Sequence, residues 1–307
     1  MSVRQQSHLA VEVASQPDRW EQVIGRVEQF RPALPEPGAA VAVLGCGSSS
    51  YVAQAYAALR EQRGDGVTDA FPASEHRLAR GYDHALVVTR SGTTTEALAA
   101  LRDARSLGIR TTVIVAAAGS PAIGLADAAV LLPEADEQSV VQSRCVTAVL
   151  ALLRTSLGED LRPAISQARA LLADPAAAVS AELEQAEQLT FLGRGWTVGL
   201  AFEAALKLRE SAQVWAEAYP AMEYRHGPIS IAGPGRAVWP LGPLPPGLAD
   251  QILATGARLE QHDDDPLVEL VRVHLLCLAR AERAGLDPDR PRHLTRSIIL
   301  DASGHAG

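Results

Sequence analysis

Short apolar runs alternate along this chain with longer segments whose apolar residues recur at three- and four-residue intervals. The runs predict buried strands and the longer segments predict amphipathic helices. In the first half, strands are expected at 39–45, 85–89, 111–117 and 128–133, and helices at 49–62, 94–108 and 139–157. Uninterrupted apolar strands separated by amphipathic helices are typical of a parallel sheet covered on both faces.

The same pattern begins again in the second half of the chain. LGCGSSSYVAQAYAALRE (44–61) resembles LGRGWTVGLAFEAALKLRE (192–210) if one gap is allowed, and each predicts a strand, a glycine-rich turn and a helix. The second copy predicts strands at 189–195 and 237–244 and helices at 197–215 and 267–285, so its sheet should have fewer strands. Five segments follow: an N-terminal helical arm (1–35), a first domain (36–158), a helical connector (159–188), a shortened second domain (189–290) and an extended tail (291–307).

Composition narrows the classes of function. The 307 residues carry a formal net charge of -8, which argues against a general nucleic-acid partner. Three cysteines without paired spacing favour neither a disulfide framework nor a zinc site. We find no apolar run long enough to span a membrane and no signal sequence, so a cytoplasmic location and no membrane partner are expected.

Two hydroxyl-rich loops, each between a strand and a helix, are the first functional candidates. GCGSSS (45–50) and TRSGTTTEA (89–97) place small residues where a helix offers free N–H groups and the positive end of its dipole. That combination suits a phosphate group, and neither loop has the Walker pattern. The alternative is ordinary helix capping, for which Thr93 and Glu96 have the spacing of a capping box.

Acid–base chemistry is predicted on the helix at 197–215. Glu203, Lys207 and Glu210 recur at helical spacing on one face, and Lys207 is the single lysine of the chain. His226 follows in an Arg-His-Gly-Pro turn. Such groups can move protons near neutral pH. A salt-bridged helix face and a structural histidine are the alternatives.

At these segments the sequence resembles the sugar isomerase (SIS) domain family, over roughly residues 35–300. The most specific segment is EAALKLRES…AEAYPAMEYRHGP. The resemblance implies an α/β fold of two tandem α/β/α sandwich domains with parallel sheets, a homodimer, and a phosphosugar as the small-molecule partner.

The resemblance also implies roles for individual residues. Family phosphate-binding positions fall on Ser48, Ser49, Thr89, Ser91 and Thr94, with Cys46, Gly47 and Arg90 beside them. The proton-shuttling glutamate falls on Glu210 and the ring-opening histidine, supplied by the neighbouring subunit, on His226, while Glu203 and Lys207 match the same helix motif. Sugar-contacting positions fall on Glu137, Val140 and Gln142, and Arg296 stands where the family has a lysine.

The expected function is that of an aldose–ketose isomerase or isomerase-deaminase acting on a hexose or amino-sugar 6-phosphate. Proton transfer between C1 and C2 requires no metal or organic cofactor. Two alternatives stay open: a non-catalytic phosphosugar sensor, and an isomerase subunit that takes ammonia from a separate glutaminase. The N-terminal glutaminase domain that amidotransferases with this domain carry is not found in this sequence, so glutamine-dependent synthesis by this chain alone is not expected.

Overall fold

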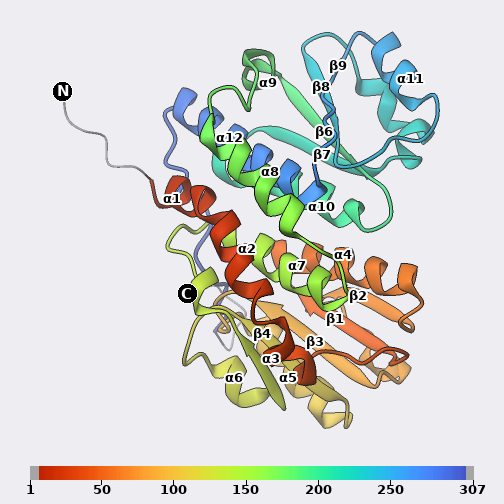
Figure 1. The fold of residues 1–307 in the computed structure, drawn as a ribbon, viewed down its shortest axis with the longest axis vertical. Helices are drawn as coiled ribbons and strands as arrows, with labels where there is room; N and C mark the ends of the chain where they lie inside the picture. The colour runs from red at the N-terminus through yellow and green to blue at the C-terminus, as the bar shows by residue number, and fades with distance from the viewer. Residues whose placement is uncertain (1–6, 302–307) are drawn as a thin grey trace, which may run out of the picture. The chain divides into compact units, whose positions relative to one another are not determined.

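The computed structural model describes residues 7–301, which contain two parallel sheets (Figure 1). Internal contacts divide these residues into two compact units, one built around each sheet. The first-sheet unit comprises Asp18–Glu137, Arg144–Leu161 and 295–301. The second-sheet unit comprises 7–17, Gln138–Ser143 and Arg162–Leu294. The chain therefore passes more than once between the units, and the N-terminal helical segment contributes to both.

Five strands form the first sheet in the order β2-β1-β3-β4-β5, and every neighbouring pair is parallel. The strands are β1 (Val41–Gly45), β2 (Thr68–Pro72), β3 (His84–Thr89), β4 (Arg110–Val115) and β5 (Ala128–Leu131). The two central strands β1 and β3 are buried along their whole length, which explains their uninterrupted apolar sequences. The prediction of a parallel sheet is confirmed.

Helices cover both faces of the first sheet (Figure 1). One face packs on α5 and α6, where Leu44 and Val87 meet Ala97 and Leu101 in a continuous core. The helices of this unit are α2 (Gln16–Ile24), α3 (Val27–Phe30), α4 (Ser48–Arg63), α5 (Thr95–Ser106), α6 (Pro121–Leu125) and α7 (Arg144–Ser156). The first two residues of α2 belong to the other unit. The 3-10 turns are η1 (Arg31–Ala33), η2 (Leu78–Arg80) and η3 (Pro133–Ala135). α4 contacts β1, β2 and α7.

The second sheet has four parallel strands in the order β7-β6-β8-β9. They are β6 (Gln188–Gly193), β7 (Trp215–Pro220), β8 (Arg236–Pro240) and β9 (Arg258–Leu259). The unit's helices are α1 (His8–Ala14), α8 (Arg162–Ala173), α9 (Ala181–Gln185), α10 (Thr197–Ala212), α11 (Leu248–Ala254) and α12 (Pro266–Arg283), with 3-10 turns η4 (Glu223–His226) and η5 (Pro228–Ile231). This sheet has fewer strands than the first, four against five, as predicted. Two tandem α/β units with parallel sheets are thus confirmed.

Two predicted helices are wrong at one end. The helix expected at 197–215 ends at Ala212, because Gln213 adopts a left-handed conformation (φ 54°) and the chain then enters β7. The helix expected at 139–157 begins at Arg144. The Glu137 carboxylate accepts a hydrogen bond of 2.6 Å from the Arg144 N–H and so fixes the start of α7.

Two segments predicted from sequence are only partly described. The N-terminal arm at 1–35 contains α1, α2 and α3, and residues 1–6 lie outside the described residues. The tail at 291–307 is predicted to be extended, but its described part contains a turn at Arg292–His293, where His293 has φ 62°, and a bend at Arg296–Ser297; residues 302–307 lie outside the described residues. Among residues 7–301, no helix combines the length and the apolar character needed to cross a membrane.

Candidate functional site

The two hydroxyl-rich loops follow the adjacent strands β1 and β3 of the first sheet. These strands pair in parallel with Leu44 opposite Val87, so their carboxyl ends lie side by side, about 5 Å apart. From β1 the chain continues to β2 on one side, and from β3 it continues to β4 on the other side. The loops therefore flank the point where the strand order reverses, which is the usual ligand position in open α/β sheets.

Glycines allow the first loop to pass close to its helix. A Cβ atom at Gly45 would lie 2.5 Å from the carbonyl carbon of Ser49, so only glycine fits between β1 and the start of α4. Gly47 has φ 54° and precedes the first residue of α4, Ser48. Because β1 ends at Gly45 and α4 begins at Ser48, the first amides of α4 lie at the carboxyl end of β1; the Ser48 and Ser49 side chains there are buried.

Cys46 lies in the same loop and stays a thiol under ordinary conditions. Burial, with a smaller contribution from the nearby Glu96 carboxylate, raises the pKa of Cys46 to about 11. A protonated thiol adds no negative charge to a loop that is predicted to bind an anion. The sequence placed Cys46 near the phosphate, and the structure places it between Gly45 and Gly47 at that end of β1.

The second loop concentrates hydroxyl groups at the start of α5. Ser91 Oγ accepts hydrogen bonds from the Thr93 N–H at 3.2 Å and the Thr93 hydroxyl at 3.0 Å. Thr89 Oγ1 accepts one from the Gly92 N–H at 3.2 Å. The N-cap residue is Thr94, and its side chain makes no capping hydrogen bond. The alternative of a capping box at Thr93 and Glu96 is therefore not supported, since the helix is preceded by Thr94 and the hydroxyls of the loop contact one another instead.

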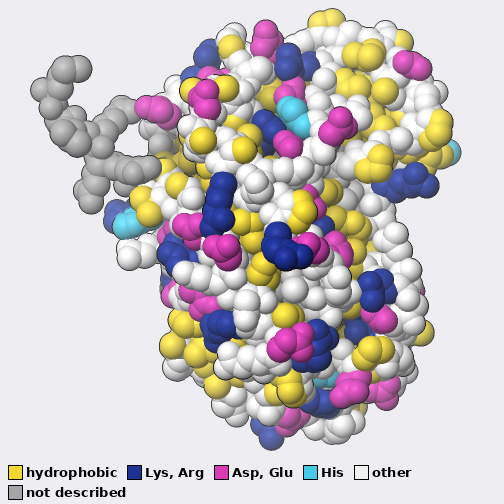
Figure 2. All heavy atoms as spheres, viewed as in Figure 1, with side chains coloured by type: hydrophobic (Ala, Val, Ile, Leu, Met, Phe, Trp, Pro, Cys, Tyr) yellow, Lys and Arg dark blue, Asp and Glu magenta, His cyan; other side chains and the backbone are white. Residues whose placement is uncertain are grey.

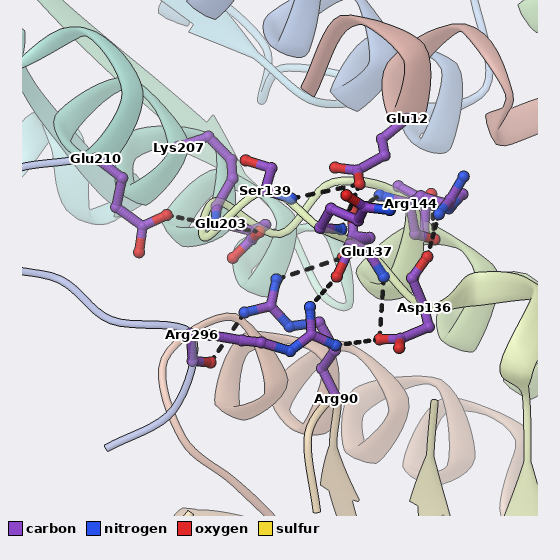
Figure 3. Close-up of polar contacts among 12 residues, drawn as sticks. Glu12, Arg90, Asp136, Glu137, Ser139, Arg144, Glu203, Lys207, Glu210 and Arg296 are labelled. Atoms are coloured by element: carbon purple, nitrogen blue, oxygen red, sulfur yellow. Dashed lines mark hydrogen bonds and ion pairs between the residues drawn. The ribbon is translucent and has the colours of Figure 1, made fainter. Parts of the chain in front are cut away.

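The Arg90 side chain is buried behind this loop in a network of charges (Figure 3). Its guanidinium lies 3.8 Å from Glu137 Oε2 and donates a hydrogen bond of 2.9 Å to the backbone oxygen of Arg296. The Arg296 guanidinium donates in turn to the Asp136 carboxylate and to the Glu137 backbone oxygen. Arg90, Glu137 and Arg296 thus contact one another, and Glu137 and Arg296 also contact Asp136.

Surface charges on the face shown in Figure 2 do not form a positive patch that could bind a phosphate in place of the loop amides and hydroxyls. On the face shown in Figure 2, basic and acidic side chains are interspersed. The formal net charge of the chain is -8, so a phosphate at the two loops would depend on backbone amides and hydroxyls rather than on a broad positive field. Among residues 7–301, no group of three or more His, Cys, Asp or Glu side chains is placed to hold a metal ion.

The second-sheet unit brings Glu203, Lys207 and Glu210 together on α10, as predicted (Figure 3). Lys207 Nζ lies 2.6 Å from Glu210 Oε2 and 3.5 Å from Glu203 Oε1. The side chains of Lys207 and Glu203 are 1% and 2% exposed, whereas that of Glu210 is 18% exposed. The salt-bridged face is thus not a solvated one, because only its last carboxylate reaches the surface.

Glu210 borders a cavity of about 760 Å³ within the second-sheet unit. The cavity is also lined by Trp215, which is 72% exposed, and by Glu217, Arg292 and His293. A carboxylate oriented by a buried lysine at the edge of a cavity can exchange protons with a bound molecule. Sequence reasoning did not single out Trp215 or Glu217, because the predicted helix ran to Trp215 and no strand was predicted at 215–220.

The remaining predicted residues lie on loops of the same unit. His226 ends the 3-10 turn η4 and is exposed. Val140 and Gln142 lie in the segment Gln138–Ser143, where the Val140 N–H donates a hydrogen bond of 3.1 Å to the backbone oxygen of Asp289. These residues are positioned by turns and by the C-terminal part of the unit, not by a helix or a strand.

Comparison with known families identifies the first-sheet unit. The model of the SIS domain family matches residues 39–156, which contain β1 to β5 and both hydroxyl-rich loops. The chain carries an SIS domain. The SIS domain prediction is thereby confirmed for the segment that contains both loops.

Solved structures resemble this chain over nearly its whole length. It superposes on a crystal structure of glucosamine-6-phosphate deaminase from Thermotoga maritima with a TM-score of 0.81 and 24% identity, covering 96% of this chain and 100% of that one. The C-terminal domain of glucosamine-fructose-6-phosphate aminotransferase from Francisella tularensis gives a TM-score of 0.79 and 20% identity, covering 95% and 100%. The fold is therefore a tandem SIS fold, with the second copy shortened.

A similar sequence of greater length is an isomerizing glutamine–fructose-6-phosphate aminotransferase from Thermus thermophilus. It is 28% identical over 314 residues, which cover 85% of this chain and 52% of that protein. This chain therefore spans about half the length of the curated relatives it matches. The activity of the longer protein carries over to this chain only as a proposal.

Proposed function

We propose that this protein is a phosphosugar isomerase or isomerase-deaminase acting on a hexose or amino-sugar 6-phosphate. The observation that carries the proposal is the pair of hydroxyl-rich loops at the strand-order reversal of the SIS domain. A phosphate there would receive hydrogen bonds from the first amides of α4 and from the hydroxyls of Ser48, Ser49, Ser91 and Thr94. Fructose 6-phosphate appears in the name of the relative from Thermus thermophilus.

In this proposal, Glu210 carries the proton between C1 and C2 of the sugar. As a carboxylate it accepts the proton from one carbon, an enediol or enolamine forms, and the proton returns to the neighbouring carbon. Lys207 donates a hydrogen bond of 2.6 Å to Glu210 and fixes the direction of its carboxylate. Glu203 places a second negative charge 3.5 Å from Lys207 and keeps the ammonium group in place behind Glu210.

The proposal also includes a homodimer in which His226 of the partner subunit assists opening of the sugar ring. This assignment rests on the family resemblance and on the exposure of His226 at the end of η4. Arg296, Val140 and Gln142 are assigned to the sugar on the resemblance alone.

The decisive experiment measures, in deuterated water, incorporation of deuterium at C2 of glucosamine 6-phosphate, or at C2 of the aldose 6-phosphate that forms from fructose 6-phosphate. Glu210→Gln should lower the exchange rate by about 10²–10⁴-fold while leaving phosphosugar affinity nearly unchanged. Glu217→Gln is the matched control, because Glu217 lines the same cavity and accepts hydrogen bonds from Trp215 and Tyr219. Exchange that survives in Glu210→Gln would remove Glu210 from the mechanism. Binding without any conversion by the wild-type protein would identify a sensor.

A further inference from the structure

The segment Gln138–Ser143 of the second-sheet unit lies outside the helices and strands, although it carries two residues assigned above to the sugar, Val140 and Gln142. Alternate residues from Ser139 to Ser143 are buried, and the two assigned residues between them are half-buried. Because the segment lies outside helices and strands, its backbone N–H groups depend on acceptors from other parts of the chain. The position of the two assigned residues therefore depends on those acceptors.

A buried carboxylate on α1 accepts two of these N–H groups (Figure 3). Glu12 is 3% exposed, and its Oε1 accepts hydrogen bonds of 2.6 Å from the Gln138 N–H and 3.4 Å from the Ser139 N–H. A charged acceptor makes a hydrogen bond about twice as strong as a neutral one. The side chain of Glu12 thus connects α1 directly to the start of the segment.

Asp289 makes a second connection between α1 and the segment. Its backbone oxygen accepts a hydrogen bond of 3.1 Å from the Val140 N–H. Its carboxylate accepts hydrogen bonds of 2.8 Å and 2.7 Å from the N–H groups of His8 and Leu9 at the start of α1. Since α1 itself contacts α12, the two connections attach the segment to a packed part of the same unit.

We propose that Glu12 is a positioning residue for sugar recognition, which holds Val140 and Gln142 where they meet the bound sugar. The inference rests on the proposed function, since that assigns these two residues to the sugar. Without Glu12, two adjacent N–H groups lose this acceptor, and the segment adopts other conformations for part of the time. The apparent affinity for phosphosugar then falls in proportion to the fraction of molecules in which the segment keeps its position.

Inorganic phosphate distinguishes this role from a general structural one. The two hydroxyl-rich loops belong to the first-sheet unit, whereas Glu12 and the segment belong to the second-sheet unit. In the proposal, phosphate alone needs neither Val140 nor Gln142. Loss of Glu12 should therefore weaken binding of fructose 6-phosphate and leave the affinity for inorganic phosphate unchanged.

Titration calorimetry of the full-length chain with fructose 6-phosphate measures the effect. Glu12→Ala should weaken binding by about tenfold to hundredfold, the effect of one hydrogen bond to a charged group. Glu12→Gln keeps a neutral acceptor of similar size and should weaken binding by only about twofold to fivefold. The affinity for inorganic phosphate is measured in parallel by its competition with fructose 6-phosphate.

Ser180→Ala is the matched control, because it removes the side chain that caps α9 in the same unit and makes no change at α1 or the segment. It should leave both affinities unchanged. Equal affinity for fructose 6-phosphate in wild type and in every Glu12 variant that folds would overturn the inference. An equal loss of affinity for inorganic phosphate would do the same, since it would reveal a general structural effect.

Hydrogen exchange at the amides of Gln138 and Ser139 gives a second readout that needs no ligand. Exchange at both should accelerate in Glu12→Ala, because the variant lacks their acceptor, and should stay unchanged in Ser180→Ala. Unchanged exchange in Glu12→Ala would mean that other contacts fix the segment, which contradicts the positioning role.

The same measurements separate this inference from the proposed function. If exchange and fructose 6-phosphate affinity change as expected but the wild-type protein converts no sugar, the isomerase assignment fails and the positioning role of Glu12 stands. If sugar is converted and the affinities are equal, only the positioning role fails. Absence of phosphosugar binding by the wild-type protein refutes both.

Discussion

The Gly45→Ala substitution, compared with a control of similar stability, should distinguish a loss of phosphate binding from a general loss of stability. Gly45 ends β1, and an added Cβ would lie 2.5 Å from the carbonyl carbon and 2.6 Å from the carbonyl oxygen of Ser49. These are backbone atoms of the first turn of α4, so no side-chain rotation can relieve the contact. Opening it from 2.5 Å to the 3.4 Å of ordinary van der Waals contact requires about 0.9 Å of movement of the helix start.

A movement of this size is large compared with the tolerance of a hydrogen bond. An N–H···O distance of about 2.9 Å would lengthen beyond the upper limit of about 3.2 Å, so the amides of α4 would lose a bound phosphate oxygen. A hydrogen bond to a charged group contributes about 1.5–3 kcal/mol. Phosphosugar affinity should therefore fall by about one to two orders of magnitude. Overpacking should lower the free energy of unfolding by about 1–3 kcal/mol.

The second unit provides a matched control. A Cβ at Gly193 would lie 2.3 Å from the Thr197 backbone oxygen, so Gly193→Ala should destabilise the protein to a similar extent without moving α4. Gly124→Ala, in helix α6 where nothing lies within 4 Å of the added Cβ, should leave affinity unchanged and should not lower stability. Affinity for fructose 6-phosphate is measured by titration calorimetry and stability by urea unfolding. Unchanged affinity in a destabilised Gly45→Ala protein, or an equal loss of affinity in Gly193→Ala, would refute the assignment of phosphate to the start of α4.

Two further predictions concern buried and partly buried charges. Lys207→Met should lower the free energy of unfolding by about 3–5 kcal/mol, because it removes the ammonium group beside buried Glu203, and adding Glu203→Gln should recover part of the loss in urea unfolding. Hydrogen bonds to Glu260 and Glu269 raise the pKa of His262 to about 9, so its contribution to stability is complete below pH 6.5 and is lost as pH rises through 9. His262→Gln should flatten this fall, and an equal fall in both proteins would contradict the assignment.

The interior of the fold could be predicted from sequence because buried strands have simple patterns. β1 and β3 are buried at every residue and appear as uninterrupted apolar runs. β2 and β7 are strands at the edges of their sheets, and each is only partly buried. Their sequences, TDAFP and WAEAYP, contain charged residues and resemble turns or helix ends, so the search for apolar runs missed them. β9 has two residues, too few to produce any periodicity.

The local chemistry of the site could be predicted only where it depends on neighbours in sequence. Glu203, Lys207 and Glu210 meet because helical geometry brings positions three and four apart together. The contact of Ser297 with Ser91 joins residues 206 positions apart, and no repeat or spacing in the sequence indicates it. Contacts of this kind depend on the whole tertiary fold.

A comparison of the two copies of the internal repeat distinguishes residues that the fold requires from residues that the proposed chemistry requires. Each copy has a glycine, Gly45 or Gly193, at which an added Cβ would clash with the backbone of the following helix. Both then have a glycine with positive φ, 54° at Gly47 and 57° at Gly195. The order β7-β6-β8-β9 repeats β2-β1-β3-β4, so the backbone is duplicated at both turns.

The side chains after these turns differ between the copies. The first helix begins with three serines, whereas the second begins after Trp196 with Thr197, whose hydroxyl accepts a hydrogen bond of 2.9 Å from the Arg194 N–H of its own turn. The second turn therefore uses its hydroxyl to stabilise itself, while the body of its helix carries the carboxylates and the lysine. If both turns bound phosphate, Gly193→Ala would weaken phosphosugar binding as much as Gly45→Ala. The divergence of hydroxyl groups predicts that it does not, because only the first copy has serines at the start of its helix.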